Sequence, residues 1–211
     1  MASDRRLVLF TAMEPSGDAH AAPVIEALLR DHPGIEICAW GGPRMAAAGA
    51  TIIGRTADDG VMGLAGVGKI RQVKALHDEI VAWSASRRVA VHVAVDSPSA
   101  NMPLSARLKP SGTRIINLVA PQLWAWAPWR LGKVKRTSDV LLCLLPFEER
   151  WFRERGATAK YIGHPVLSKV VDPQRIAEER AQLAPGGPRI VILPGSRSGE
   201  VRANGRLLTE V

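Results

Sequence analysis

Short apolar runs, each followed by a stretch with a helical pattern, recur along most of the chain. The clearest run is Val89–Val95, which is nearly continuous in apolar side chains. Such continuity is typical of a central parallel strand, because helices cover both faces of a parallel sheet. Repeated strand–helix units therefore predict an α/β fold with a parallel sheet between two layers of helices.

The same pattern predicts the remaining strands and a division of the chain into two parts. Gly163-His164-Pro165 breaks the last strand of the first part, so we expect one domain over residues 1–165. Residues 166–211 then hold a linker, a charged helix near Pro173–Leu183, and one further strand, glycine turn and helix. One β-α unit cannot bury both faces of a sheet, so we expect an incomplete second domain. The strands are expected at Leu7–Phe10, Ile35–Trp40, Thr51–Ile53, Val89–Val95, Arg114–Val119, Val140–Leu145, Lys160–Ile162 and Arg189–Leu193.

A loop with polar side chains follows the first strand. It runs from Met13 to Asp18 and leads into a helix that we expect to reach about Arg30. Ser16 or Asp18 suits the N-cap of this helix, and a helix N-terminus at this place suits an anion. A simple helix-start turn explains the same residues, and the dinucleotide fingerprint GxGxxG is absent.

Asp96 follows the buried strand Val89–Val95 directly. The carboxyl end of a parallel strand is where α/β proteins place ligand sites, so Asp96 is a candidate catalytic base. A helix begins just after it, in the stretch that contains Asn101. An aspartate there also suits a helix cap, and the sequence leaves both interpretations open.

Three tryptophans lie within six positions: Trp124, Trp126 and Trp129, and Arg130 comes next. Residues 61–155 carry 15 basic and 7 acidic side chains, so the basic surplus surrounds these rings. Amphipathic rings beside cations suit a lipid phosphate or an anionic membrane surface. A buried tryptophan cluster beside a solvated basic helix is the simpler explanation.

Several classes of protein are disfavoured by what the sequence lacks. The segment Gly63–Lys69 has the spacing of a P-loop, but Ile70 stands where a hydroxyl would hold magnesium, so we do not expect an ATPase. Cys38 and Cys143 belong to no metal-binding cluster, and we expect buried thiols with neither metal nor cofactor. There is no nucleic-acid motif. No apolar run spans a bilayer and no signal peptide is evident, so a cytoplasmic location is expected.

Eight ordered segments together resemble the lipid-A-disaccharide synthase family, glycosyltransferase family 19, across nearly the whole chain. Each segment is a weak signal, and their order and spacing make the set specific. They are Glu14-Pro15-Ser16-Gly17-Asp18, Gly41-Gly42-Pro43-Arg44-Met45, Val61-Met62-Gly63, Asp96-Ser97-Pro98, Trp124-Ala125-Trp126, Leu145-Pro146-Phe147-Glu148, Ile162-Gly163-His164 and Leu193-Pro194-Gly195-Ser196-Arg197.

The resemblance implies a GT-B fold, in which two Rossmann-like domains flank the active site. It implies an inverting hexosyltransferase that joins UDP-2,3-diacylglucosamine to 2,3-diacylglucosamine 1-phosphate (lipid X) and releases UDP, with no metal in the chemistry. It also implies a peripheral location on the inner face of the inner membrane. Family members are about twice as long as this chain, and a homodimer would be one way to supply a second domain.

The resemblance also assigns roles to residues. Asp96 would be the general base that takes the proton of the acceptor 6′-hydroxyl. Arg197 would hold the donor's UDP, and the tryptophans would meet acyl chains, phosphates or the membrane. The positions expected to contact substrate are Glu14, Ser16, Gly17, Asp18, Met62, Asn101, Trp124, Trp126, Arg130, His164 and Arg197.

Three departures from the family pattern keep other functions open. Family members commonly read Asp-Ala-Pro-Asp-Phe-Asn where residues 96–101 read Asp-Ser-Pro-Ser-Ala-Asn. They commonly carry Ser-Pro-Ser where residues 120–122 read Ala-Pro-Gln, and Glu in place of Gly66. One alternative is a non-catalytic module that binds acylated sugar phosphates or anionic membranes. Another is a GT-B enzyme for a different UDP-sugar, which would leave exposed tryptophans unexplained.

Overall fold

A computed structural model describes residues 6–57, 67–168, 172–183, 190–195 and 198–210 of the chain. The chain divides into two compact units, Met1–Ser168 and Lys169–Val211. We call these unit 1 and unit 2. We expected the division at residue 165, three residues before the observed end of unit 1.

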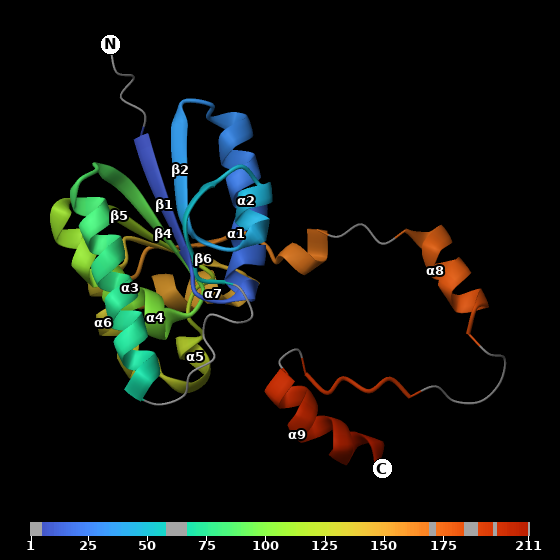
Figure 1. Cartoon of the computed structure of the whole chain (residues 1–211). Helices are drawn as coiled ribbons and strands as arrows, with labels where there is room; N and C mark the ends of the chain where they lie inside the picture. The colour runs from blue at the N-terminus through green and yellow to red at the C-terminus, as the bar shows by residue number, and fades with distance from the viewer. Residues whose placement is uncertain (1–5, 58–66, 169–171, 184–189, 196–197, 211) are drawn as a thin grey trace. The chain divides into compact units, whose positions relative to one another are not determined.

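Unit 1 is built on one seven-stranded sheet in which every neighbouring pair of strands is parallel. The strand order is β3-β2-β1-β4-β5-β6-β7, so the chain starts in the middle and extends first to one side and then to the other. Figure 1 shows β1, β2, β4 and β5 in this arrangement. The strands are β1 (Arg6–Ala12), β2 (Ile35–Gly41), β3 (Thr51–Arg55), β4 (Val89–Val95), β5 (Arg114–Leu118), β6 (Val140–Cys143) and β7 (Ala159–Tyr161).

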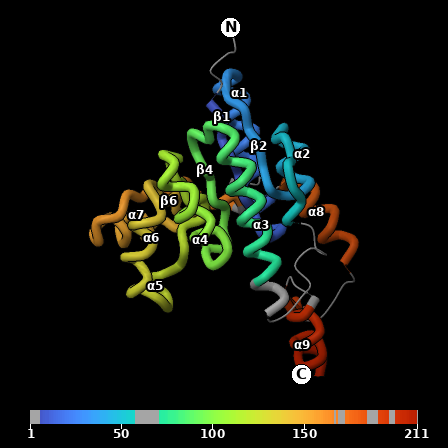
Figure 2. Tube along the Cα trace, turned by 60° about the vertical axis from the view of Figure 1, so that its left-hand side comes forward, coloured from blue at the N-terminus to red at the C-terminus, as the bar shows by residue number. Residues whose placement is uncertain are grey.

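Helices cover both faces of this sheet. In Figure 1, α1 and α2 lie on one side of β1 and β4, and α3 and α4 lie on the other. Figure 2 shows α3 and α4 packed next to each other. The helices of unit 1 are α1 (Pro15–Asp31), α2 (Pro43–Ala47), α3 (Val67–Ala85), α4 (Pro98–Leu108), α5 (Leu123–Trp126), α6 (Leu131–Thr137) and α7 (Pro146–Arg153), with 3-10 turns η1 (Lys109–Ser111), η2 (Pro128–Arg130) and η3 (Pro165–Ser168).

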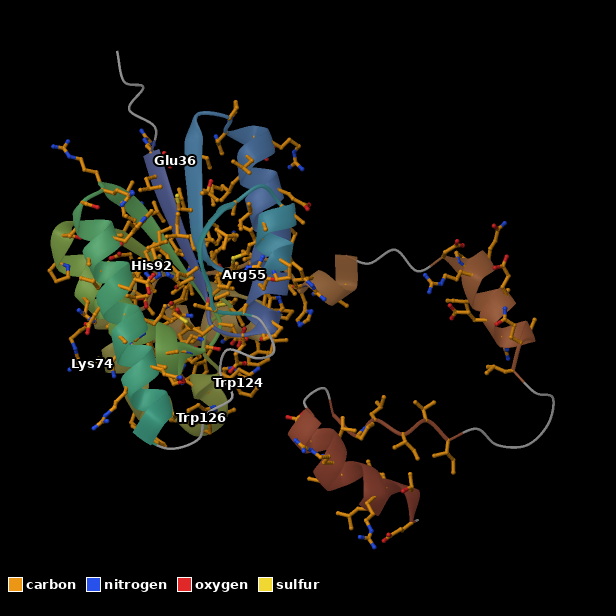
Figure 3. The ribbon with its side chains drawn as sticks, in the orientation of Figure 1. Glu36, Arg55, Lys74, His92, Trp124 and Trp126 are labelled. Carbon is orange, nitrogen blue, oxygen red and sulfur yellow. The ribbon has the colours of Figure 1, made fainter. Side chains whose placement is uncertain are left out.

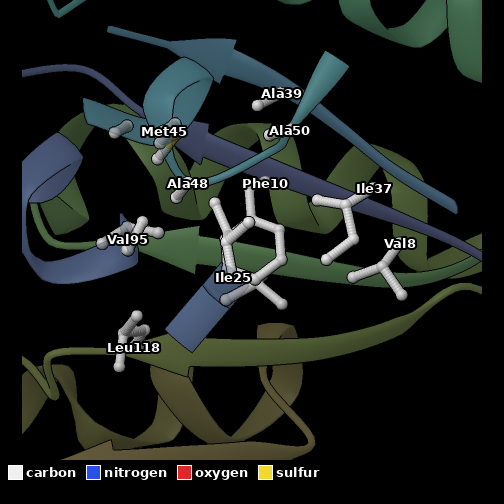
Figure 4. Close-up of a cluster of buried hydrophobic side chains, with 13 residues drawn as sticks. Val8, Phe10, Ile25, Ile37, Ala39, Met45, Ala48, Ala50, Val95 and Leu118 are labelled. Atoms are coloured by element: carbon white, nitrogen blue, oxygen red, sulfur yellow. The ribbon is translucent and has the colours of Figure 1, made fainter. Parts of the chain in front are cut away.

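The core follows from the alternation of side chains along β1. Phe10 packs with Ile25 of α1 and Met45 of α2 in one buried cluster, which Figure 4 shows in close-up. Its neighbour Leu9 packs with Ile80 of α3 in the cluster on the opposite face. Successive residues of a strand point to opposite faces, so a strand that is apolar at nearly every position supplies both clusters. This explains why the apolar runs of the sequence are continuous.

Seven strands, a parallel sheet and helices on both faces are all confirmed, with strand ends within two residues of the predicted ones. Cys38 and Cys143 are buried free thiols in β2 and β6, as predicted. Burial raises the pKa of the Cys143 thiol to about 12, which keeps it protonated. The loop that we expected after β5 contains a short helix, α5, and the turn η2.

Unit 2 differs from our prediction in one element. Its described residues form two helices, α8 (Pro173–Ala181) and α9 (Ser198–Thr209), and the side chain of Asp172 caps α8 by accepting a bond from the Gln174 amide. The strand predicted at Arg189–Leu193 is wrong for its described part, residues 190–193, which is not in a strand. A strand needs a neighbour to accept its backbone hydrogen bonds, and the described part of unit 2 offers no other strand.

Candidate functional site

The strand order places the candidate site between β1 and β4. The chain turns there from one side of the sheet to the other, and α/β proteins bind ligands at the carboxyl ends of the strands at such a switch point. Ser16 lies in the first turn of α1, which follows β1, and Asp96 follows β4. The Ser16 hydroxyl donates a hydrogen bond of 3.0 Å to Oδ2 of Asp96. Two residues 80 positions apart are thus joined across the switch point.

The backbone of Asp96 has an uncommon conformation. Its φ is +52°, that of Ser97 is +41°, and Val119 after the adjacent β5 has a φ of +71°. These are the three residues other than glycine with positive φ in the described part of the chain. Such conformations cost free energy, most of all for a β-branched residue such as valine. Residues in strained conformations cluster at functional sites.

The Asp96 carboxylate is also a candidate cap for the helix that follows it, α4. Ser97 occupies the N-cap position of α4, and its side chain makes no capping hydrogen bond. The Asp96 carboxylate instead accepts bonds from the Ser97 amide, at 2.7 Å, and from Ser16. Asp96 is partly exposed and lies at the switch point.

Asn101 lies behind Asp96, and its observed contacts are with the protein, while its predicted role as a substrate contact stays a prediction. The residue is buried, and its side-chain amide donates to the carbonyls of Val95 and Asp96, at 2.9 Å each. Its carbonyl accepts a bond of 2.8 Å from Thr11, which also lies 2.8 Å from His92. The polar atoms of Asn101 are occupied by the protein itself, so Asn101 supports the loop of Asp96.

The predicted N-cap role of Asp18 in α1 is wrong. Asp18 is 2% exposed, and its carboxylate accepts three bonds of 3.0 Å from the amides of Gly42, Arg44 and Met45. These amides belong to the start of α2, so Asp18 caps α2 from a distance rather than α1. The N-cap of α1 is Glu14, which is half-buried.

Gly17 is required by close packing. A Cβ at this position would lie 3.1 Å from Cβ of Ala12 and 3.2 Å from the carbonyl oxygen of Val95. The absence of a side chain therefore lets the start of α1 approach the ends of β1 and β4. Gly17 brings Ser16 to Asp96 and offers no side chain to a substrate.

Two histidines adjoin the same edge of the sheet. The rings of His20 and His164 meet edge to face, with centroids 6.2 Å apart. The pKa of His20 is lowered, mainly by burial. The nearby Asp96 raises it, and His164 lowers it further. The sequence pattern indicated His164 but not His20. The available signal was spacing, since residues 16 and 20 are one helical turn apart and lie on one face of α1.

The predicted aromatic segment lies beyond the carboxyl edge of the sheet, where Figure 3 labels Trp124 and Trp126. Trp126 is 56% exposed and Trp129 is 77% exposed, and the guanidinium of Arg130 lies 5.7 Å from the Trp126 ring centroid. Phe147 from α7 adds a ring whose centroid is 4.8 Å from that of Trp124. We call these five residues the aromatic surface.

Trp124 differs from its two neighbours. The sequence left exposed and buried tryptophans both open, and Trp124 is only partly exposed. Its indole nitrogen donates to Oε1 of Glu148 at 3.0 Å, while Oε2 of Glu148 accepts from the Leu145 amide at 3.1 Å. The buried Glu148 therefore ties the start of α7 to α5, which the sequence pattern alone did not indicate.

Two predicted substrate contacts, Met62 and Arg197, lie outside the described residues, as does most of the segment Gly63–Lys69. No group of metal-binding side chains occurs among the residues that the structure describes. Over the same residues, no helix combines the length and apolar character that crossing a bilayer requires.

Comparison with known proteins identifies the family. A family model described as lipid-A-disaccharide synthetase matches residues 8–211. The chain belongs to this family. Relatives named lipid-A-disaccharide synthase include one from Myxococcus xanthus, 36% identical over 207 residues, which are 97% of this chain and 53% of the relative. Another, from Pseudomonas fluorescens, is 33% identical over 96% of this chain and 54% of its own length. The chain thus spans about half the length of these members of the family.

Solved structures show the same fold. Anabaena HepE, crystallised with UDP and glucose, has a TM-score of 0.53 at 13% identity and is matched over 84% of this chain and 50% of its own. UGT89C1 from Arabidopsis thaliana, crystallised with quercetin, has a TM-score of 0.54 at 14% identity, over 86% and 56% of the two chains. At these identities the likeness establishes the fold alone. It agrees with the Rossmann-like sheet that the family resemblance implied.

Proposed function

We propose that this chain supplies the acceptor-side half of an inverting glycosyltransferase of lipid A biosynthesis. The reaction joins UDP-2,3-diacylglucosamine to lipid X and releases UDP. Family membership supports the reaction class, and the names of the relatives support the substrates. The single observation that carries the assignment to this unit is the partly exposed Asp96, whose carboxylate accepts a bond from Ser16 across the switch point.

In this proposal Asp96 acts as general base. Its carboxylate accepts the proton of the acceptor 6′-hydroxyl while that oxygen attacks C1 of the donor sugar from the face opposite UDP. The bond from C1 to the diphosphate breaks, the configuration at C1 inverts, and UDP carries away the electron pair. A base of this kind contributes roughly 10²–10⁴-fold to such a step. Arg197 is proposed to stabilise the diphosphate, and Glu14 and His164 to contact the sugars.

The test is transfer of labelled lipid X onto UDP-2,3-diacylglucosamine. Two proteins are compared: the 211-residue chain, and a chimera in which the chain is continued by the C-terminal half of the Myxococcus xanthus relative. We expect disaccharide from the chimera. A folded chimera that binds lipid X without forming product would contradict the proposal and support the alternative, a non-catalytic module for acylated sugar phosphates.

The aromatic surface supports a second element of the proposal, a peripheral location on an anionic membrane. Trp126 and Trp129 are largely exposed, and Arg130 and the basic residues of α6 follow them. Exposed amphipathic rings enter the interfacial region of a bilayer, and adjacent cations attract anionic headgroups. We propose that this surface rests on the inner face of the inner membrane and brings the acyl chains of both substrates to the site.

Vesicle binding tests this location. The double variant Trp126→Ala/Trp129→Ala should bind vesicles containing anionic lipid at least about tenfold more weakly, because two rings leave the interface. Leu167→Ala is the matched control, since it removes a side chain that is 79% exposed but lies outside the aromatic surface. Equal vesicle binding by the double variant, the control and the parent chain would exclude the aromatic surface as a membrane contact.

A further inference from the structure

A chain of buried polar side chains runs behind Asp96, on the side of the sheet that α4 covers. It consists of Ser105 and Asn101 from α4, His92 from β4 and Thr11 from β1, each at most 1% exposed. Figure 3 shows His92 within the body of unit 1. Polar groups buried in an apolar core are costly unless each finds a hydrogen-bond partner. Four of them in contact therefore call for a common explanation.

The donor and the acceptor of each hydrogen bond in this series of side chains can be assigned. The amide nitrogen of Asn101 donates to the carbonyls of Val95 and Asp96, so its carbonyl oxygen faces Thr11 and accepts the Thr11 hydroxyl proton. That hydroxyl has no second proton, so Nε2 of His92 must be the donor in its 2.8 Å contact with Thr11. Nδ1 of His92 is then free to accept from the Ser105 hydroxyl, 3.4 Å away. Burial lowers the pKa of His92 to about 3, which keeps the ring neutral as this arrangement requires.

The two bonds that the Asn101 side-chain amide donates act on the backbone geometry of Asp96. The carbonyl of Val95 belongs to the peptide plane before Asp96, and the carbonyl of Asp96 belongs to the plane after it. Asn101 holds both planes at 2.9 Å, and the orientation of these planes sets φ and ψ of Asp96. A φ of +52° is unfavourable for aspartate and persists only where its surroundings enforce it.

We propose that Thr11, His92 and Asn101 are positioning residues for Asp96. His92 fixes the direction of the Thr11 hydroxyl, Thr11 fixes the side-chain amide of Asn101, and Asn101 holds Asp96 in the left-handed conformation that aims its carboxylate at Ser16. The catalytic part of this inference rests on the proposed function, and the structural part does not.

Hydrogen exchange in the 211-residue chain tests the structural part. Thr11→Val keeps the shape of the side chain and removes the hydroxyl. We expect exchange of the Asp96 and Ser97 amides to accelerate at least about tenfold more than exchange of the Val93 amide, because the loss is local. Thr11→Ser restores the hydroxyl and should return the ratio to that of the parent. Thr113→Val removes another buried hydroxyl, which donates to the Val89 carbonyl at 3.0 Å, and should leave the ratio unchanged.

Equal acceleration at all three amides would mean a general loss of stability and would overturn the inference. If Thr11→Val does not fold, His92→Phe, which removes the donor to Thr11, is compared in the same way. In the active chimera, Thr11→Val should lower kcat at least about tenfold with the KM for lipid X within about threefold, and Thr11→Ser should restore it. An unchanged kcat beside a large loss in Asp96→Asn would overturn the catalytic part. Retained turnover in Asp96→Asn would instead contradict the proposed function and leave the structural part standing.

Discussion

Asp139 lies at the amino ends of the parallel strands, which we call the amino edge, and Asp96 lies at their carboxyl ends, the carboxyl edge. The two carboxylates are stabilised differently. At the amino edge, Asp139 lies just before β6 and accepts bonds of 2.7 Å from the Lys109 ammonium and from the Ile115 amide. At the carboxyl edge, Asp96 accepts bonds from a hydroxyl and from the amide of the next residue, in a strained conformation. Among the described residues, Asp96 has no ion pair.

This difference distinguishes a carboxylate with a structural role, Asp139, from the one that we propose to be catalytic, Asp96. Asp139 joins η1 to the starts of β5 and β6, and its charge is balanced by a cation, so its bonds contribute mainly to stability. Asp96 is partly exposed, and strained backbone surrounds it. Such strain is characteristic of functional sites, and among the described residues the non-glycine positive φ values all lie at the end of the sheet where the ligand is expected.

The largest expected difference between the two carboxylates is in turnover. In the active chimera, Asp96→Asn should lower kcat by about 10²–10⁴-fold, because an amide cannot accept the proton of the acceptor hydroxyl. The KM for lipid X should stay within about threefold. Asp139→Asn is the matched control and should keep kcat within about threefold of the parent. Comparable kcat losses in the two variants would remove the distinction between the edges.

The close packing at Gly17 allows a second test of the carboxyl edge, because a larger residue there must displace α1 from the strand ends. Gly17→Ala places a methyl group 3.1 Å from the Ala12 Cβ and 3.2 Å from the Val95 carbonyl, so α1 must shift away from the strand ends. We expect the free energy of unfolding to fall by about 1–3 kcal/mol, as for other overpacked sites. Denaturant unfolding measures it. Gly34→Ala is the control, since nothing lies within 4 Å of its added Cβ. A Gly17→Ala chain as stable as the Gly34→Ala chain would refute the close approach.

Asp139 should matter for stability where Asp96 matters for turnover. Asp139→Asn weakens the bond from Lys109 and keeps a side chain of the same shape, so we expect unfolding to become easier by about 1–2 kcal/mol. Lys109 and Asp139 are about one-third exposed, which places the loss at the lower end for charged partners. Chemical denaturation of the 211-residue chain provides the value. A loss as large in Asp96→Asn would show that both edges serve stability alike.

The last prediction concerns pH and the neutral His92. Its pKa is about 3 in the folded chain and should be near 6.5 in the unfolded chain, which therefore binds more protons between these values. Stability must then rise with pH across this window and fall as the medium is acidified. The slope from this one group is about 1 kcal/mol per pH unit. Urea unfolding from pH 6 to pH 4 should give a shallower slope for His92→Phe, and equal slopes would mean that His92 is protonated in the fold.

The fold and the main candidate residue could be predicted because both depend on local pattern. A continuous apolar run identifies a buried parallel strand, and Asp96 was recognised by its place at the end of one. The tryptophan segment was recognised in the same way. The sequence left open whether its rings are exposed or buried, and the structure shows two exposed rings and a partly buried Trp124.

The roles of Asp18 and Asn101 could not be predicted because their partners lie far away in the sequence. The amides that bond Asp18 come 24 to 27 residues later, and the hydroxyl that bonds Asn101 comes 90 residues earlier. A polar residue in a recognised motif can contact the ligand or hold the loop that does, and only the tertiary packing distinguishes the two. The strand expected near residue 190 failed for a related reason, since a strand is defined by its neighbour.

The most direct test of the account is where lipid X binds on the 211-residue chain. Amide NMR shifts are followed while a short-chain form of lipid X is added. Binding at the switch point predicts the largest shifts at Ser16, Asp96 and Ser97, with Asp139 and Ile115 at the opposite edge unchanged. Saturable shifts that leave Ser16, Asp96 and Ser97 unaffected would contradict the assignment of this edge as the acceptor site.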